Sequence, residues 1–215
     1  LQPLIYGGKG VGSQGDGTAQ FVVRDQECQS RMVKIVERDL GMSCLRLTIH
    51  SARRVRKALI PAAGHGTRLY PATKSIRKEL FPVIGPDGKA KPAILHIVEE
   101  ALSAGVEEVC IVIQARDRPV FEDFFKLPPT VEHFNKLSED DKKLTERLLD
   151  IGHRVRLISQ DVQEGFGHAV YCAREWVGNE PFLLLLGDHL YKSESGRSCG
   201  RQLVDLFGKV GHSVV

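Results

Sequence analysis

The chain has 215 residues, of which 42% are hydrophobic and 27% charged, and its formal net charge is +3. This composition is typical of a globular protein with a buried core, and so small a charge, spread along the chain, argues against a nucleic-acid partner. The sequence has no apolar run long enough to span a membrane and no secretory signal pattern, and its five widely spaced cysteines favour reduced thiols in a cytoplasmic protein.

Residues 1–54 are predicted to form a separate unit. Six glycines lie within residues 7–18, which favours a loop, and a strand over 19–23, a helix ending at Gly41 and a strand over 44–49 follow. This order resembles the last segment of a GHMP-family sugar kinase. The resemblance implies a small, ferredoxin-like α+β kinase remnant whose nucleotide site and catalytic base lie upstream. The alternative is a glycine-rich turn that supports a small α/β layer.

A short polar junction at residues 50–54 separates this unit from the rest of the chain. The composition changes there, so we place the domain boundary after residue 54, and residues 55–215 form the second domain. The chain starts at Leu1 rather than Met and stops at the apolar Val215. We therefore expect it to be a piece of a longer protein.

The second domain opens with the most informative stretch, residues 55–83. It predicts a buried strand that ends at Pro61, followed by a loop over residues 62–67 in which four of six residues are Ala or Gly. Small residues let the backbone approach a ligand and turn its N–H groups toward an anion. Four cations follow, namely Arg68, Lys74, Arg77 and Lys78. The stretch indicates a phosphate-binding loop, and the alternative is a tight turn with a solvated basic face.

The run G-x-G-T-R-x-x-P-A-T-K-x-x-x-K-E-x-x-P, which begins at Gly64, resembles the signature of the bacterial sugar nucleotidyltransferases. It is most similar to that of the UTP-glucose-1-phosphate uridylyltransferase family. One position departs from the signature, because the family usually has Pro before the second lysine, Lys78, and this chain has Arg77. The resemblance covers about residues 55–215.

Strands and helices then alternate along the chain. Apolar residues at helical spacing predict a helix that ends at Gly105, and residues 109–113 form a second buried strand. This order predicts a right-handed parallel crossover, so we expect a Rossmann-like α/β sheet with helices on both faces, truncated where the chain ends. Residues 118–150 are predicted to be helical. Their phenylalanines indicate either the buried stripe of a helix or a partner surface.

The second informative stretch, residues 160–170, follows a predicted strand over 154–159. The amide of Gln160 can both donate and accept, so it can read the N3–H and O4 edge of uracil or thymine, or it is simply a solvated strand end. The spacing from Gln160 to Gly165 and on to G-H-A resembles the base-recognition element of the same family. The resemblance implies that Gln160 and Gly165 contact the base. For His168, a base contact and a hydrogen bond to a nearby carbonyl both stay open.

A continuous apolar strand is predicted over residues 181–186, and Gly187 and Asp188 follow it directly. A carboxylate at this strand end is well placed for Mg²⁺, which prefers oxygen ligands, and the alternative is a turn or helix-cap Asp. In the resembled family an Asp at this strand end binds magnesium. The resemblance therefore implies that Asp188 is the metal ligand.

The resemblance implies that UTP and a sugar-1-phosphate, glucose-1-phosphate before others, react to give a UDP-sugar such as UDP-glucose and pyrophosphate, with Mg²⁺ as cofactor. It assigns Arg68 and Lys78 to catalysis. The nucleotide-binding residues that it implies are Ala62, Ala63, Gly64, Gly66, Thr67, Gln160, Gly165 and Gly187. Two alternatives remain, a thymidylyl- or cytidylyltransferase of the same fold and a non-catalytic nucleotide-binding module fused to a sugar kinase. The oligomeric state, a homo-oligomer included, stays open.

Overall fold

The structure is a computed structural model that describes residues 2–11, 18–44 and 54–215. The chain forms two compact units, Leu1–His50 and Ser51–Val215, so the division between them falls within the polar junction of the sequence. None of the helices in the described ranges is long and apolar enough to cross a membrane.

The amino-terminal unit contains a β-hairpin and a helix. Its elements are η1 (Gln2–Leu4), β1 (Ile5–Val11), β2 (Thr18–Val23) and α1 (Gln26–Asp39). The prediction of a glycine-rich loop was wrong for residues 7–11, because their backbone pairs with β2 in an antiparallel ladder. The remaining glycines of that loop and the strand predicted over residues 45–49 lie outside the described residues.

Helix α1 is defined at both ends by its sequence. The Asp25 carboxylate accepts a hydrogen bond from the Cys28 N–H at 2.7 Å, which satisfies one of the free N–H groups of the first turn. The helix stops before Gly41, whose φ is +62°, and this confirms the predicted helix end. Met32 and Val36 are buried together with Leu4, so this unit has its own small core.

The second unit is built on a four-stranded parallel sheet in the order β7-β6-β3-β8. The strands are β3 (Lys57–Pro61), β6 (Glu108–Ile113), β7 (Val155–Ser159) and β8 (Phe182–Leu184). A small antiparallel hairpin consists of β4 (Pro82–Ile84) and β5 (Ala90–Pro92). The strand predicted over 181–186 was too long: beyond β8 the Leu185 N–H still donates to Leu59 O at 3.0 Å, and the chain then turns with the His189 N–H on Leu186 O.

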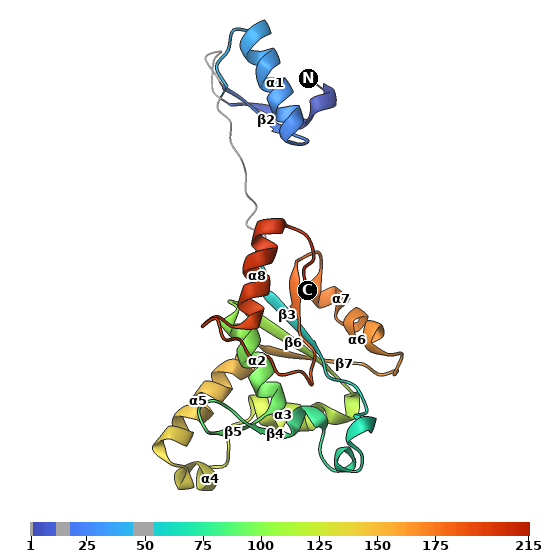
Figure 1. The fold of residues 1–215 in the computed structure, drawn as a ribbon, viewed down its shortest axis with the longest axis vertical. Helices are drawn as coiled ribbons and strands as arrows, with labels where there is room; N and C mark the ends of the chain where they lie inside the picture. The colour runs from blue at the N-terminus through green and yellow to red at the C-terminus, as the bar shows by residue number, and fades with distance from the viewer. Residues whose placement is uncertain (1, 12–17, 45–53) are drawn as a thin grey trace. The chain divides into compact units, whose positions relative to one another are not determined.

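Helices cover both faces of this sheet, as predicted (Figure 1). Side chains alternate between the faces along each strand, so Ala58 and Ile60 of β3 lie in one core while Leu59 lies in the other. The helices are α2 (Ala93–Ser103), α3 (Arg118–Lys126), α4 (Val131–Lys136), α5 (Glu139–Arg154), α6 (Phe166–Cys172), α7 (Arg174–Val177) and α8 (Cys199–Val210). The larger core includes residues of α2, α3 and α5, and the smaller core residues of α6 and α7. The sheet is therefore the central layer of this unit.

The phenylalanines of the predicted helical excursion belong to the core. Phe121 and Phe125 of α3 are 1% and 0% exposed, and Phe124 packs partly buried against the same cluster. The buried-stripe interpretation is confirmed, and the alternative of a partner surface is wrong for these rings.

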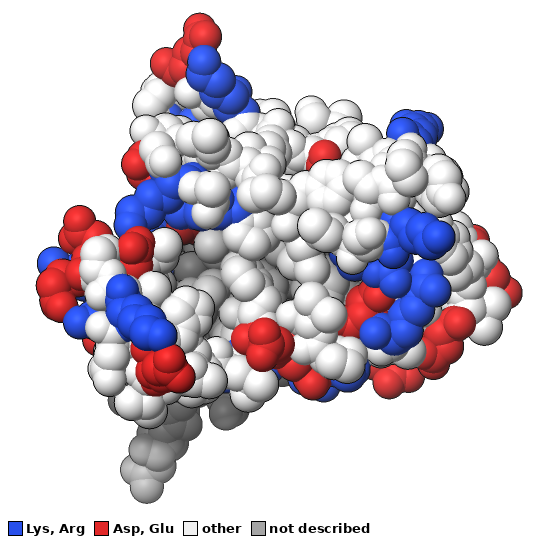
Figure 2. Space-filling model, turned by 90° about the horizontal axis from the view of Figure 1, so that it is seen from below, with Lys and Arg blue, Asp and Glu red and all other residues white. Residues whose placement is uncertain are grey.

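On the face shown in Figure 2, Lys and Arg side chains stand beside Asp and Glu side chains.

Candidate active site

The loops that follow the parallel strands meet at one edge of the sheet, since the carboxyl ends of parallel strands share an edge. The first residue after β3, Ala62, donates its N–H to Val112 O of β6 at 2.7 Å. The first residue after β7, Gln160, donates its N–H to Ile113 O at 2.8 Å. The two stretches that the sequence singled out therefore flank the end of β6.

The glycine-rich loop is shaped by close contacts that require glycine. Gly66 has φ +65°, and a Cβ atom on it would lie 2.8 Å from Thr73 Cγ2 and 3.5 Å from Lys78 Cδ. The Thr73 hydroxyl donates to Gly66 O at 3.0 Å. A Cβ atom on Gly64 would lie 3.6 Å from Lys78 Nζ, so the ammonium group of Lys78 lies over the loop. Both glycines are thus neighbours of Lys78.

Lys78 also contacts the carboxylate that follows β8. Its Nζ lies 2.6 Å from Asp188 Oδ2, although the two residues come from different loops. Gly187 allows this approach, because a Cβ atom there would lie 2.8 Å from Pro61 O. The hydrogen bond from Lys78 lowers the pKa of Asp188, despite the opposing effect of burial. Asp188 is therefore ionised at neutral pH and half exposed, with 45% of its side chain accessible.

Asp188 is compatible with a divalent cation that takes most of its ligands from water and phosphate groups. In the described ranges no group of three or more His, Cys, Asp or Glu side chains could hold a metal by itself. Magnesium, however, keeps several waters and is commonly bound through one or two carboxylates plus substrate phosphates. A single exposed carboxylate beside the glycine-rich loop is compatible with that requirement, whereas His189, whose Nε2 lies 4.0 Å from Asp188 Oδ1, is a poor magnesium ligand.

Glu79 is part of this site, and sequence reasoning gave it no role. It is 1% exposed, and its Oε1 atom has no hydrogen-bond donor within the described structure. The nearest cation is Lys78, whose Nζ lies 3.6 Å from Oε1. Burial raises the pKa of Glu79 to about 7, and the charge of Lys78 offsets only part of this effect. Its place after the second lysine of the signature was the available signal.

The candidate base-reading side chain is held by its own loop. Gln160 is 3% exposed, and its amide Nε2 donates to Gly165 O at 3.2 Å. The same Nε2 lies 3.0 Å from His168 Nδ1, which in turn lies 3.0 Å from Val162 O. His168 therefore contacts the Gln160 amide and a carbonyl. Gly165 precedes α6 as its N-cap residue.

Gln114, which sequence reasoning missed, links the strand ends. Directly after β6, this 6% exposed residue donates its Nε2–H to Ala63 O at 2.7 Å. The bond holds the main chain of Ala63, which like Ala62 is buried. A polar residue straight after a buried strand was the signal for it, in the same position that Gln160 occupies after β7.

A cavity of about 580 Å³ opens beside the loop. Its lining includes His65, Thr67 and Thr73, together with the cations Lys74, Arg77 and Arg116. Arg68, in η2 (Thr67–Leu69), is exposed and is not one of the lining residues. No carboxylate within the described ranges pairs with it. The structure thus brings Lys78 and Asp188 together, and it leaves Arg68 free at the surface.

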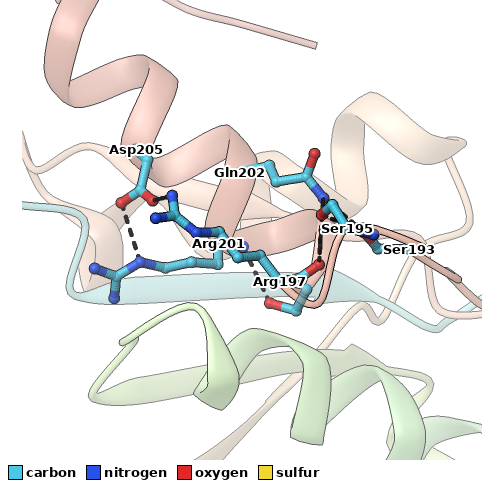
Figure 3. Close-up of polar contacts among 7 residues, drawn as sticks. Ser193, Ser195, Arg197, Arg201, Gln202 and Asp205 are labelled. Atoms are coloured by element: carbon cyan, nitrogen blue, oxygen red, sulfur yellow. Dashed lines mark hydrogen bonds and ion pairs between the residues drawn. The ribbon is translucent and has the colours of Figure 1, made fainter.

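The segment after Asp188 is tied to helix α8 (Figure 3). The Gln202 amide donates to the hydroxyl oxygens of Ser193 and Ser195 at 2.9 and 3.2 Å. Arg197 and Arg201 both pair with Asp205, at 3.2 and 3.0 Å. These arginines are therefore compensated locally. The contacts anchor the far end of the loop that carries Asp188 onto a packed helix.

Comparison with known proteins places the second unit in a defined group. The family model described as nucleotidyl transferase matches residues 57–202. The chain is 39% identical over 166 residues to a UTP-glucose-1-phosphate uridylyltransferase of Bacillus subtilis (strain 168), with 76% of this chain and 53% of the relative covered. It is 37% identical over 165 residues to the protein of that name from Staphylococcus epidermidis, covering 76% and 54%.

Solved structures give the same result. A crystal structure of apo UDP-glucose pyrophosphorylase is similar with a TM-score of 0.62 and 34% identity, over 73% of this chain and 56% of that one. A UTP-bound enzyme from Acinetobacter baumannii is similar with a TM-score of 0.58 and 32% identity, over 73% and 54%. The chain spans about half the length of the curated relatives that it matches.

Proposed function

The chain belongs to the nucleotidyl transferase family, and from this premise we propose that the complete protein transfers the uridylyl group of UTP to a sugar-1-phosphate. Glucose-1-phosphate is the first candidate, and the products are a UDP-sugar and pyrophosphate. The observation that carries the proposal is the contact of 2.6 Å between Lys78 and Asp188, next to a glycine-rich loop at the carboxyl edge of the sheet. The similarity to UTP-glucose-1-phosphate uridylyltransferases supports the choice of UTP.

In this reaction a phosphate oxygen of the sugar-1-phosphate attacks the α-phosphorus of UTP in line. The bond from that phosphorus to the oxygen bridging the α- and β-phosphates breaks, and pyrophosphate leaves with the electron pair. The chain contributes positioning and charge. Lys78 would lie at the α-phosphate, Arg68 would reach the β- and γ-phosphates, and the N–H groups of Gly64, Gly66 and Thr67 would donate to phosphate oxygens.

Magnesium fits Asp188 and would neutralise phosphate charge when bound. In the described structure Lys78 donates a charge-assisted hydrogen bond to the Asp188 carboxylate. Binding of the nucleotide would therefore redistribute this pair, so that Lys78 turns toward phosphate and the carboxylate becomes available. The pair keeps both charges in place before substrate arrives.

Uracil would rest against Ala62, Ala63 and Gly165, with Gly187 close by, and the Gln160 amide would read its edge. Because Gln160 already donates to Gly165 O, its orientation is set before binding. A panel of UTP, dTTP, CTP and ATP with the complete protein tests this choice. If dTTP or CTP were turned over in preference to UTP, the protein would be a thymidylyl- or cytidylyltransferase of the same fold and the proposal of uridylyl transfer would be wrong.

The decisive variant is Asp188→Asn in the complete protein, since it is nearly isosteric and removes the charge. We expect turnover, measured as pyrophosphate released with glucose-1-phosphate as acceptor, to fall by about 100-fold or more, as for the loss of one electrostatic group at a transition state. Asp205→Asn is the matched control, because Asp205 pairs with arginines of the α8 region. Equal rates and equal magnesium dependence for Asp188→Asn and wild type would contradict the proposal.

For residues 1–54 we keep the proposal of a GHMP-kinase remnant, supported by the sequence pattern and compatible with the hairpin β1–β2 and helix α1. A coding sequence upstream that lacks a sugar kinase would contradict it. A reducing compartment such as the cytoplasm is also proposed, since all five cysteines are free thiols.

A further inference from the structure

A second cavity, the β7 groove, lies along the edge strand of the sheet. It has a volume of about 390 Å³, and its lining residues come from β7, the end of α5, helix α3 and the first residue of β6. The groove therefore opens near the amino ends of β6 and β7. The loops that carry Ala62 and Gln160 leave the carboxyl ends of the strands, so the β7 groove is separate from the candidate active site.

The β7 groove carries an excess of positive charge. Its permanently charged lining side chains are Arg118, Lys126, Arg154 and Arg156. Glu108 is the only acidic residue among those that line it in the described part of the chain. Outside the lining, Glu122 pairs with Arg118 at 3.2 Å. Four cations therefore face two carboxylates, and a concave surface with such an excess attracts anions.

Two of these cations already bind the edge strand. Arg118 donates to Leu157 O at 3.2 Å. Lys126 donates to Val155 O at 2.9 Å. A β-strand added to this edge would need these carbonyl groups as hydrogen-bond acceptors, and the cations cover them. The groove is thus unsuited to an added strand and suited to a ligand that accepts hydrogen bonds from side chains.

The other two cations are available to such a ligand. Arg156 is exposed and makes no ion pair with any residue that the structure describes. Arg154 is also exposed, and it donates to the backbone carbonyl groups of Glu107 and Val106, each at 3.0 Å. These bonds position its guanidinium group without neutralising it. Guanidinium groups match the geometry of phosphate oxygens and can bind them through two parallel hydrogen bonds.

We propose that the β7 groove binds a phosphate dianion through Arg154 and Arg156, with His153 as a further lining donor. The excess of two positive charges matches the charge of this ligand. The ligand is either inorganic phosphate or the phosphate group of a small molecule. This site is additional to the nucleotide site and does not depend on the proposed function.

Titration of the isotope-labelled 215-residue chain with inorganic phosphate, followed by amide chemical shifts in NMR spectra, tests the site. The ionic strength is held constant, at a pH where phosphate is a dianion. We expect phosphate to shift the amide signals of residues 153–157. The dissociation constant read from these shifts should rise about tenfold in Arg156→Gln, the usual effect of losing one charged hydrogen bond. Arg156→Lys, which keeps the positive charge, should lose less affinity.

Arg174→Gln is the matched control, since Arg174 is 51% exposed, belongs to α7 and does not line the groove. It should leave phosphate binding at residues 153–157 unchanged. Glycerol 2-phosphate separates the two sources of the ligand. If it shifts the same signals, the groove admits a phosphorylated small molecule, and if it does not, the groove is limited to free phosphate.

Three outcomes would overturn the proposal. Shifts confined to residues 62–78 would mean that phosphate binds only at the glycine-rich loop. Unchanged affinity in Arg156→Gln would show that this side chain does not bind the anion. An equal loss of affinity in Arg174→Gln would indicate a general effect of surface charge. None of these measurements requires turnover, so a complete protein that makes no UDP-sugar would contradict the proposed function alone.

Discussion

The buried carboxyl group of Glu79 makes the stability of the folded protein depend on pH. Its pKa is about 7 in the folded protein and 4.5 in the ordinary, solvated state, mainly because burial disfavours the charged form. The folded state therefore binds more protons than the unfolded state between these two values. Stability falls as pH rises from about 4.5 to about 7, and the loss is complete above the folded-state pKa.

We predict that Glu79→Gln raises the free energy of unfolding by about 3 kcal/mol at pH 8. At pH 4 the change should be small, because Glu79 is then mostly protonated in both the folded and the unfolded protein. Urea denaturation of variant and wild type at the two pH values measures this. Glu132→Gln, on an 81% exposed side chain, is the control and should show no such difference. A Glu79→Gln effect that is the same at both pH values would refute the assignment.

Arg77 shows how one residue can replace a proline. Its φ of −64° and ψ of 139° place it in the backbone region that a proline ring enforces, immediately before Lys78. Here an ion pair restrains Arg77 instead. Its guanidinium group lies 2.6 Å from Oδ1 of Asp117, whose side chain is 6% exposed.

We predict a coupling energy of about 2 kcal/mol between Arg77 and Asp117 in a double-mutant cycle with Ala, because removing one partner leaves the other charge buried. Chemical denaturation of the four proteins gives the value. The exposed pair Lys136–Glu132, with side chains 71% and 81% accessible, should give less than about 0.5 kcal/mol. A coupling energy no larger than that of this exposed pair would show that Asp117 does not anchor Arg77.

At the scale of elements, helix α3 protects the edge of the sheet. Strand β7 is an edge strand, and such a strand presents free carbonyl groups that can pair with another chain. At one end of α3, Arg118 donates to Leu157 O at 3.2 Å. At the other end, Lys126 Nζ donates to Val155 O at 2.9 Å and to Gly152 O at 3.1 Å. Two alternate carbonyls of β7 are thus covered by cations.

We predict that Lys126→Met, which keeps the apolar stem and loses the ammonium group, lowers the free energy of unfolding by about 1–2 kcal/mol and promotes association of the native protein. Urea denaturation and light scattering at increasing protein concentration measure the two effects. Lys136→Met is the control, because Lys136 pairs with an exposed glutamate on its own helix. If both variants behave alike, the cationic cover of β7 has no such role.

At the scale of the whole molecule, the two compact units each have their own core. The amino-terminal core consists of Leu4, Met32 and Val36 with a few neighbours, while the second unit contains the two clusters around its sheet. Trp176 is the only tryptophan of the chain and belongs to the second unit. Its fluorescence therefore reports the unfolding of that unit alone.

We predict that residues 54–215 by themselves unfold, by tryptophan fluorescence in urea, at the same midpoint as in the 215-residue chain. The physical reason is that a unit with its own core depends little on a neighbouring unit. A midpoint shifted by more than experimental error would show that the amino-terminal unit stabilises the second one.

Local patterns were sufficient for much of the fold and for the choice of candidate residues. Features that depend on neighbouring residues can be predicted from residue spacing in the sequence. They include the apolar runs of β3, β6 and β7, the helix end at Gly41 and the small-residue loop at Gly64. Pattern reasoning failed at β1, where glycines form a strand, because antiparallel pairing with β2 overrides the local preference of glycine for loops.

The contacts across the site depend on the tertiary structure, because no spacing rule relates residues of different loops. Lys78 meets Asp188 from 110 positions away only where the ends of β3 and β8 adjoin. The burial of Glu79 and the pairing of Arg77 with Asp117 likewise arise from packing between separate segments. Sequence supplies the chemical groups, and the parallel sheet brings their strand ends to one edge, where burial and charge then set how each group behaves.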